Sequence, residues 1–351
     1  MSYTSPRTDL ATIDVLLPTY NTITIAGEDV LRQQIDSILG QLGVTVRILI
    51  TDDCSLDNTF DFLHGRYADD PRIELRRNPR NIGQMATLAS LLERVEAHYF
   101  AFCDHDDVWL ASKLEVTVTV LIRENTDLVY SDLFLVNENL EVTAESAMAA
   151  GGVFGVRGHR PLSVLLKNPA HGCTILGRST LIAEALPLPK EITLHDRYFA
   201  ILASCRKGLS YCHSQQVFYR QHGANTVGVV SQDLSGLRLR SQGNIRAYLS
   251  KRLASRKAYI AAWRHWNPKS KSASFLAFHA RQPVAVRLLL LPCYLAIVLT
   301  GAFEIGPRAI ITDAILTAVS PRGDALMGSQ PFVYTVESEQ LQSKRKDAYH
   351  T

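Results

Sequence analysis

Short apolar runs alternate with helical patterns from the N-terminus to about position 135. The runs that we expect to form strands are Ile13–Leu17, Val46–Ile50, Ile73–Arg76, Tyr99–Cys103 and Leu128–Tyr130. The apolar residues between them recur at the spacing of one helix face, and they are Leu31, Ile35, Ile38, Leu39 and Leu42, then Met85, Leu88, Leu92 and Val95, then Leu114, Val118 and Leu121. Repeated strand–helix units predict an α/β domain with a central, mostly parallel sheet.

The pattern becomes less regular past Asn137. Further strands are expected at Cys173–Leu176 and Val217–Tyr219, with a helix over Leu194–Cys205 between them. A basic, helical region follows from Asp233. We therefore expect an α/β domain over residues 1–228, a helical extension over 229–337 and a polar tail over 338–351.

Composition and cysteine usage indicate a globular protein with reduced thiols. The chain has 351 residues, of which 46% are hydrophobic and 20% charged, and this argues against a disordered or fibrous chain. Its six cysteines form no CxxC pair, and the N-terminus lacks a basic-then-apolar secretory signal. We expect a cytoplasmic location.

The C-terminal third is basic and contains an apolar segment. No Asp or Glu occurs from Leu234 to Phe303, although the net formal charge is only +3. Within the segment 284–303, the uncharged run Leu288–Phe303 has sixteen residues, which is short for a membrane span of about 20 apolar residues, and Pro292 interrupts it. Extending the run back to Val284 includes Arg287. The segment could lie at a membrane interface beside its basic flank, form a buried helix hairpin or cross the membrane. We expect peripheral contact with the inner face of the cell membrane, and the buried hairpin is an alternative that fits about equally well.

Two aspartates follow the second expected strand. Asp52 and Asp53 stand at its carboxyl end, where open α/β sheets bind ligands. Capping of the next helix by Ser55 or Asp57 is the alternative, and it explains some of these polar residues but not both aspartates.

Three carboxylates follow the fourth expected strand. Asp104, Asp106 and Asp107 would repel one another unless a cation holds them together. Mg²⁺ and Mn²⁺ prefer such oxygen ligands and are often shared with substrate phosphates. A solvated acidic loop fits poorly, because the cluster follows an apolar strand and precedes Trp109.

Two later motifs carry further polar groups. Asp196, flanked by His195 and Arg197, could act as a general base or could cap a helix. The strand ending in Arg220, Gln221 and His222 offers donors that suit a leaving diphosphate.

Together these motifs resemble those of the family 2 glycosyltransferases of the GT-A fold. The resemblance runs from Ile13 to about Gly228, and its order and spacing are specific. It is carried by Val15–Asn21, Thr51–Thr59, Asn78–Gly83 and Asp104–Trp109, with Lys113 and Leu114 behind them.

The resemblance implies a role for each matching residue. Pro18, Thr19, Tyr20 and Asn21 would bind the nucleotide, with Asp52 or Asp53 accepting a hydrogen bond from the base. Asp104 and Asp106, with Asp107 beside them, would carry Mn²⁺ or Mg²⁺ to the donor diphosphate. Asp196 would be the catalytic base, although His195 stands where the family usually has Glu. Gln221, His222 and Arg220 would contact the diphosphate, while His171 and His195 would lie near the acceptor.

A finer similarity concerns the donor. Asp104–Trp109 together with Tyr219–Asn225 is similar to a bacterial subgroup that includes rhamnosyltransferases of cell-surface polysaccharide assembly, whose donor is dTDP-L-rhamnose. The resemblance implies inverting transfer to a glycan or to a sugar on a polyprenyl carrier. No nucleic-acid partner is expected.

Other functions remain as alternatives. The donor could be a UDP-hexose. A nucleotidyltransferase would usually have a glycine-rich phosphate loop near the first strand, but Pro18 to Thr24 contains no glycine. A non-catalytic sugar-nucleotide-binding relative would lack the base or the metal pair. A dinucleotide-dependent oxidoreductase would need a GxGxxG motif after the first strand, which is absent.

Overall fold

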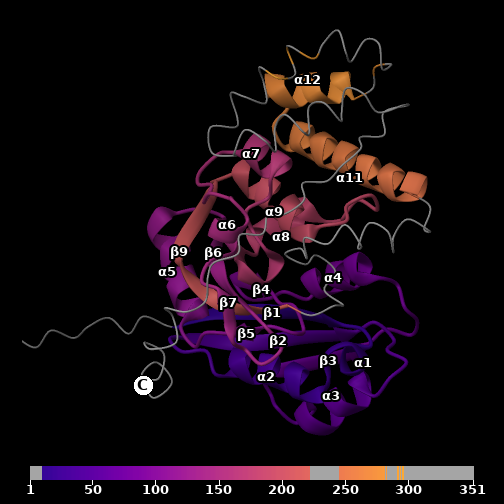
Figure 1. The fold of residues 1–351 in the computed structure, drawn as a ribbon, viewed down its shortest axis with the longest axis vertical. Coiled ribbons are helices and arrows are strands. Elements are labelled where there is room, and N and C mark those ends of the chain that lie inside the picture. The colour runs from indigo at the N-terminus through magenta and orange to yellow at the C-terminus, as the bar shows by residue number, and fades with distance from the viewer. Residues whose placement is uncertain are drawn as a thin grey trace, which may run out of the picture.

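The computed structural model describes residues 10–221 and 245–280, together with Gln282, Leu291, Cys293 and Leu295. One nine-stranded sheet organises the described chain, in the order β3-β2-β1-β4-β8-β6-β9-β5 with β7 beside β6 (Figure 1). The strands are β1 Ala11–Thr19, β2 Val44–Asp52, β3 Ile73–Arg77, β4 Tyr99–Phe102, β5 Val108–Trp109, β6 Leu128–Val136, β7 Val142–Ala144, β8 Ile175–Arg178 and β9 Leu209–Arg220.

The N-terminal half of the sheet is parallel. β3, β2, β1 and β4 pair in parallel, and β1 stays in register with β2 from Ala11 opposite Val44 to Thr19 opposite Asp52. β6 and β9 also pair in parallel, whereas β5, β7 and β8 join in antiparallel. The expected α/β fold with a mostly parallel sheet is therefore confirmed. The parallel half brings the loops after β1, β2, β3 and β4 to one edge, where such sheets bind ligands.

Helices cover both faces of the parallel strands (Figure 1). α1, α2 and α3 lie on one side, and α4, α8 and α9 lie on the other. The helices are α1 Thr22–Ala26, α2 Glu28–Leu39, α3 Thr59–Tyr67, α4 Gln84–Leu92, α5 Lys113–Glu124, α6 Ala147–Ala150, α7 Pro161–Leu166, the short 3-10 helix η1 Gly172–Thr174, α8 Thr180–Ala185, α9 His195–Ser204, α11 Ile245–Trp266 and α12 Lys271–His279.

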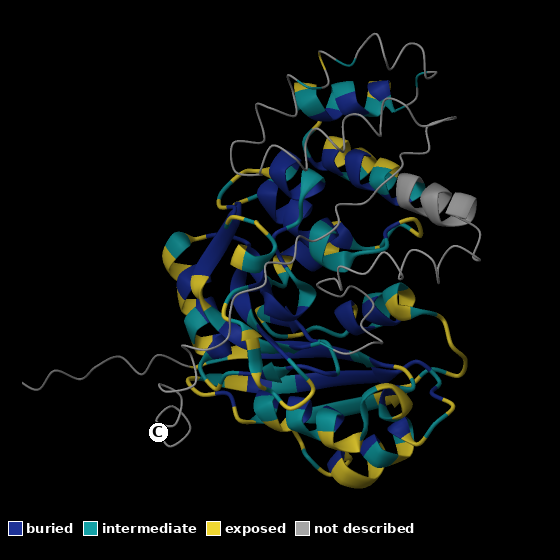
Figure 2. Cartoon of the chain, viewed as in Figure 1, coloured by how far each residue is buried: buried dark blue, intermediate teal, exposed yellow. Residues whose placement is uncertain are grey.

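Alternate residues of each strand belong to different cores. Leu16 of β1 packs in a cluster with α4 and α9, whereas its neighbours Val15 and Leu17 pack in a second cluster with α2 and α3. All three are fully buried, and Figure 2 shows the strands as buried along most of their length. A strand buried on both faces needs a continuous apolar run, which explains the runs in the sequence.

The expected helix faces are largely confirmed. Leu31, Ile35 and Ile38 of α2 are buried, as are the expected core residues of α5 and two of those of α4. Leu42 is the exception, with 61% of its surface exposed. It lies beyond the end of α2 at Leu39, so the continuation of the stripe to Leu42 was wrong.

The described part of the C-terminal extension packs against the α/β domain. Tyr259, Ile260, Trp263 and Trp266 of α11 are buried in the cluster that contains α9. Leu291 and Leu295, from the apolar segment, are partly buried against the same cluster. Among the described helices, none has the length and apolarity needed to span a bilayer. Most of 284–303 and the whole 338–351 tail lie outside the described residues, and the boundary at 228 remains a prediction.

Candidate active site

Hydrogen bonds tie the loop after β1 to the loop after β2. Asn21 adopts the left-handed backbone conformation with φ 48°. Its main-chain N–H donates to Ser55 Oγ at 2.9 Å, and its Oδ1 accepts from Leu56 N at 2.7 Å. The predicted nucleotide-binding segment Pro18–Asn21 therefore lies beside the loop that carries Asp52 and Asp53.

Asp53 is buried and organises the edge of the sheet. Its Oδ1 accepts hydrogen bonds from Asn78 Nδ2 at 2.8 Å and Ile82 N at 2.9 Å, and its Oδ2 accepts from Gly83 N at 2.8 Å. Gly83 has φ +87°, a conformation that side chains disfavour, so glycine suits this approach to the carboxylate. Asp53 thus fixes the loop after β3 against the loop after β2.

Asp52 holds its own loop in the same way. It is fully buried, and its carboxylate accepts hydrogen bonds from Thr19 Oγ1, Ser55 N and Ser55 Oγ. Arg77 Nε lies 3.5 Å from its Oδ2. The cap residue of α3 is Asn58, so the alternative of capping by Ser55 or Asp57 was wrong, although Asp57 Oδ1 accepts from Thr59 N. The base-binding roles of Asp52 and Asp53 stay predictions, but both carboxylates are already engaged with protein donors.

The acidic run after β4 forms a compact group with a cysteine. One ligand atom from each of Asp104, Asp107 and Cys173 lies within 4.8 Å of the other two. Asp107 is fully buried, its Oδ1 accepts from Arg220 N at 3.2 Å, and its Oδ2 has no hydrogen-bond partner. Asp106 lies outside this group but is also buried.

The electrostatics of this group suit a cation. Burial and repulsion from Asp106 and Asp196 raise the pKa of Asp104 to about 7. Burial, with repulsion from the neighbouring aspartates, raises the pKa of Asp107 well above its usual range. Burial also raises the pKa of the Cys173 thiol, which therefore keeps its proton. A hard divalent ion therefore fits the oxygens of Asp104 and Asp107 better than the sulfur.

Lys113 supplies a buried positive charge near the acidic group. It is fully buried at the start of α5, with Nζ 3.5 Å from the centre of the Trp109 ring and without a hydrogen-bond partner. Burial lowers its pKa to about 8, and the neighbouring acidic groups oppose that effect when they are ionised. The sequence motif includes Lys113 but predicts no role for it. The available signal is a lysine six positions after Asp107, beyond the apolar residues 108–111.

Asp196 lies near the acidic group although it comes from α9. Its charge acts on Asp104, His171 and His195, so three motifs far apart in the sequence meet here. The cap residue of α9 is Leu194, and Asp196 lies in the first turn, where its Oδ1 accepts from Arg197 N at 2.5 Å. The capping alternative for Asp196 was therefore wrong. An acidic side chain in the first turn is favourable to the helix dipole.

The two predicted histidines flank Asp196. His195 meets the Phe102 ring edge-on, with ring centroids 4.5 Å apart. A Cβ atom at position 172 would lie 2.8 Å from His195 Nε2, so the glycine there leaves room for the imidazole. Burial lowers the pKa of His171 and of His195, although Asp196 partly opposes this. Both imidazoles are therefore neutral near pH 7, so each can hydrogen-bond to a ligand without adding charge.

Arg220 braces the acidic loop from inside the protein. Its guanidinium donates to Asp106 O at 3.1 Å, to Gln33 Oε1 at 2.9 Å and to Glu138 O. Arg220 is only 3% exposed, whereas a direct contact with a diphosphate would need a donor that faces solvent. Gln221 N donates to Val136 O at 2.9 Å, and His222 lies outside the described residues.

Part of the chain is similar to known proteins. Residues 14–179 match the family described as Glycosyl transferase family 2. The chain is 29% identical over 178 residues to UDP-Glc:alpha-D-GlcNAc-diphosphoundecaprenol beta-1,3-glucosyltransferase WfgD of Escherichia coli, covering 50% of this chain and 64% of that protein. It is 26% identical over 222 residues to dTDP-rhamnosyl transferase RfbG of Shigella flexneri, covering 60% and 73%.

A solved structure also aligns with the chain. The crystal structure of S. aureus TarS 1-349 aligns with a TM-score of 0.47 and 14% identity, over 85% of this chain and 82% of that one. The chain spans less than two thirds of the length of the E. coli relative.

Proposed function

The chain carries a family 2 glycosyltransferase domain, and from this premise we propose that it transfers a sugar from a nucleotide-activated donor to an acceptor hydroxyl. The observation that carries the proposal is the meeting of Asp104 and Asp107, after β4, with Asp196 in the first turn of α9. Carboxylates for a cation and a separate carboxylate for a proton are what such a transfer requires.

Asp196 is the proposed general base. The acceptor hydroxyl gives its proton to the Asp196 carboxylate while its oxygen forms a bond to the anomeric carbon of the donor sugar. The bond from that carbon to the diphosphate oxygen breaks, and the nucleotide diphosphate leaves with the electron pair. One displacement inverts the configuration, so the chain needs no separate nucleophile.

Asp104 and Asp107 are the proposed ligands of Mn²⁺ or Mg²⁺, with Asp106 beside them. The bound ion would neutralise the charge that grows on the leaving diphosphate. The unpartnered Oδ2 of buried Asp107 supports this assignment. The main-chain N–H of Arg220 orients Asp107 by donating to its Oδ1.

The nucleotide is proposed to bind at the edge formed by the loops after β1, β2 and β3. Tyr20, Leu56 and Ile82 are exposed large apolar residues of these loops, at 38%, 85% and 41%. Apolar side chains exposed at a ligand-binding edge can pack against the flat face of a nucleotide base. The fixed loop conformations around Asp52 and Asp53 support a preformed site.

The donor is proposed to be dTDP-L-rhamnose, with a UDP-hexose as the alternative. Similarity to the relative named as a dTDP-rhamnosyl transferase supports the first. Similarity to the relative named for UDP-Glc supports the second. Both names are consistent with a role in bacterial surface polysaccharide synthesis, and a glycan or polyprenyl-linked sugar is the proposed acceptor.

A panel of nucleotide sugars with Mn²⁺ tests the proposal. Nucleotide diphosphate release is measured for the wild type and for Asp196→Asn, with dTDP-L-rhamnose and UDP-hexoses among the donors. We expect release from at least one donor by the wild type and a large loss in the variant. Pyrophosphate release from a nucleoside triphosphate would favour a nucleotidyltransferase, and binding without turnover would favour a non-catalytic protein; either result contradicts the proposal.

A further inference from the structure

The N-terminus of α9 lacks a cap of its own. Leu194 occupies the cap position with an extended backbone, φ −130° and ψ 107°, and its side chain makes no capping hydrogen bond. The first main-chain N–H groups of a helix have no partners within the helix, so another group has to satisfy them. The position of this turn matters because Asp196 is its second residue.

The hydroxyl of Tyr259 in α11 hydrogen-bonds to both main-chain groups of Leu194, whose carbonyl also accepts from Tyr198 N within α9 at 3.3 Å. Leu194 N donates to Tyr259 Oη at 3.0 Å, and Tyr259 Oη donates to Leu194 O at 3.1 Å. Tyr259 is 2% exposed, so this bridge is shielded from water. A hydroxyl that donates and accepts at one residue fixes that residue in two directions.

A second contact to the segment before α9 comes from the preceding turn of α11. Ser255 Oγ of α11 lies 3.0 Å from Thr193 Oγ1, and Ser255 is 3% exposed. Ser255 and Tyr259 are four residues apart and lie on the same face of α11. On the other side of the turn, the Phe102 ring packs against His195. The first turn of α9 is thus held between α11 and the end of β4.

We propose that Tyr259 is a positioning residue that holds the first turn of α9 so that Asp196 faces the group formed by Asp104 and Asp107. This inference rests on the proposed function. It gives α11, which lies beyond the matched family region 14–179, a role in the transfer reaction. A displacement of about 1 Å at a reacting group can lower a rate about a hundredfold, so a small shift of this turn would be visible.

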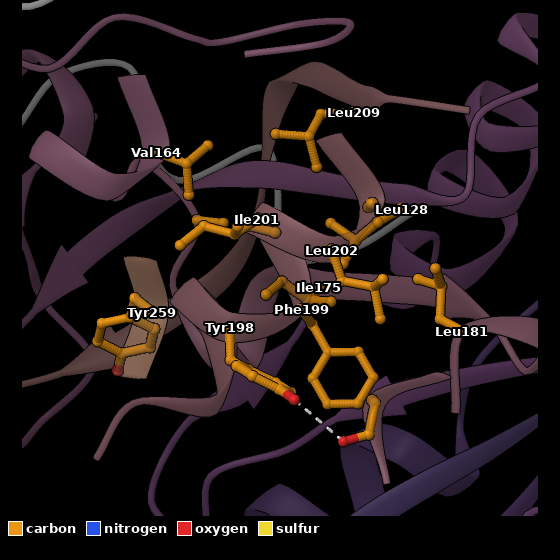
Figure 3. Packing of buried hydrophobic residues seen from close by; sticks show 14 of the residues in the cluster. Leu128, Val164, Ile175, Leu181, Tyr198, Phe199, Ile201, Leu202, Leu209 and Tyr259 are labelled. Atoms are coloured by element: carbon orange, nitrogen blue, oxygen red, sulfur yellow. Dashed lines mark hydrogen bonds between the residues drawn. The ribbon is translucent and has the colours of Figure 1, made fainter. Parts of the chain in front are cut away.

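Tyr259→Phe tests the inference, with Tyr198→Phe as the matched control. Tyr198 is also buried, at 3%, and its hydroxyl donates one hydrogen bond at 3.2 Å to Ala185 O, away from the first turn of α9 (Figure 3). Each variant keeps its ring and loses only a buried hydroxyl. We expect Tyr259→Phe to lower kcat about tenfold or more while the donor KM changes less than about twofold. We expect Tyr198→Phe to retain the wild-type kcat.

Two results would overturn the inference: a wild-type kcat in Tyr259→Phe, or an equal loss in both variants. In an Asp196→Asn background, Tyr259→Phe should cause no further loss, because it acts through Asp196. Amide hydrogen exchange gives a readout that does not depend on activity. Tyr259→Phe, but not Tyr198→Phe, should speed exchange at Leu194. If the wild type transfers no sugar, the proposed function fails, and unchanged exchange at Leu194 would separately contradict the positioning role.

Discussion

At the scale of single residues, Asp107 shows how the site depends on side chains from distant elements. It is fully buried, one of its oxygens has no hydrogen-bond partner, and Arg220 N donates to the other. The Arg220 guanidinium also holds Asp106 O and reaches Gln33 in α2. The acidic loop therefore keeps its shape through an arginine on β9.

Arg220→Lys should weaken the metal site without removing a ligand. Lysine cannot reproduce the planar set of donors that contacts Asp106, Gln33 and Glu138. We expect the Mn²⁺ concentration for half-maximal activity to rise about tenfold or more, as for other residues that orient metal ligands. Arg206→Lys is the control, because Arg206 contacts Trp266 O and Glu184 instead. An unchanged Mn²⁺ requirement in Arg220→Lys would contradict the bracing role.

Some of these residues were predictable from sequence and others were not. Asp104 and Asp107 follow an apolar strand directly, so their place at the edge of the sheet could be predicted. The bracing role of Arg220 depends on Gln33 and Glu138, which are far away in the chain. No spacing rule connects those positions, so the motif indicated only a possible phosphate contact.

At the scale of elements, a buried ion pair links β1 to β2. Asp14 is fully buried and accepts two hydrogen bonds from Arg47, at 2.9 and 2.8 Å. Its Oδ2 also accepts from Glu96 N and Ala97 N, before β4. Burial raises the pKa of Asp14, but these hydrogen bonds outweigh burial and lower it below 3.8.

Asp14→Asn should destabilise the fold in a pH-dependent way. The substitution removes the charged partner of two Arg47 hydrogen bonds, while Arg47 keeps its ion pair with Glu96 at 2.9 Å. We therefore expect a loss of about 1–3 kcal/mol in unfolding free energy near neutral pH. Because the folded-state pKa is lowered, the wild-type advantage is full above about pH 4 and disappears as the pH falls through that pKa. Asp70→Asn, which breaks a more exposed pair with Arg72, should cost less than about 1 kcal/mol. Denaturant unfolding at several pH values measures this, and equal losses in both variants would refute it.

Element boundaries show where sequence patterns stop being informative. β9 is longer than the expected strand because it includes exposed polar residues, His213 and Ser214. β6 continues past the expected end at Tyr130 to Val136. Cys173 was expected to open a strand but lies in η1, with β8 starting at Ile175. The apolar runs identified the buried strand centres, whereas pairing partners set the ends.

At the scale of the whole molecule, the described part of the extension contributes to the core of the α/β domain. Tyr198 of α9 and Trp266 of α11 meet edge-on with ring centroids 4.9 Å apart, and Figure 1 shows α11 and α12 beyond α7, α8 and α9. Removing residues from 233 onward would expose this core, so truncation cannot test membrane contact cleanly. Four exposed cations in the described part of the extension offer a gentler test, and they are Lys257, Arg264, Lys269 and Lys271.

Reversing these four charges to Glu should weaken binding to anionic vesicles. Lys and Arg near an anionic surface contribute about 1 kcal/mol each, so we expect a large loss of co-sedimentation at low salt. The control reverses four exposed cations of the α/β domain and changes the net charge equally, at Arg66, Arg123, Lys190 and Lys207. Equal losses in the two variants, or no binding by the wild type, would contradict membrane contact through the extension.

Single-turnover transfer by Asp196→Asn tests the central claim most directly. The donor and acceptor are saturating, and donor binding is measured separately by calorimetry. We predict unchanged donor affinity and a transfer rate lower by about a hundredfold to ten-thousandfold, because the acceptor hydroxyl loses its base. Transfer by Asp196→Asn at the wild-type rate would contradict the account.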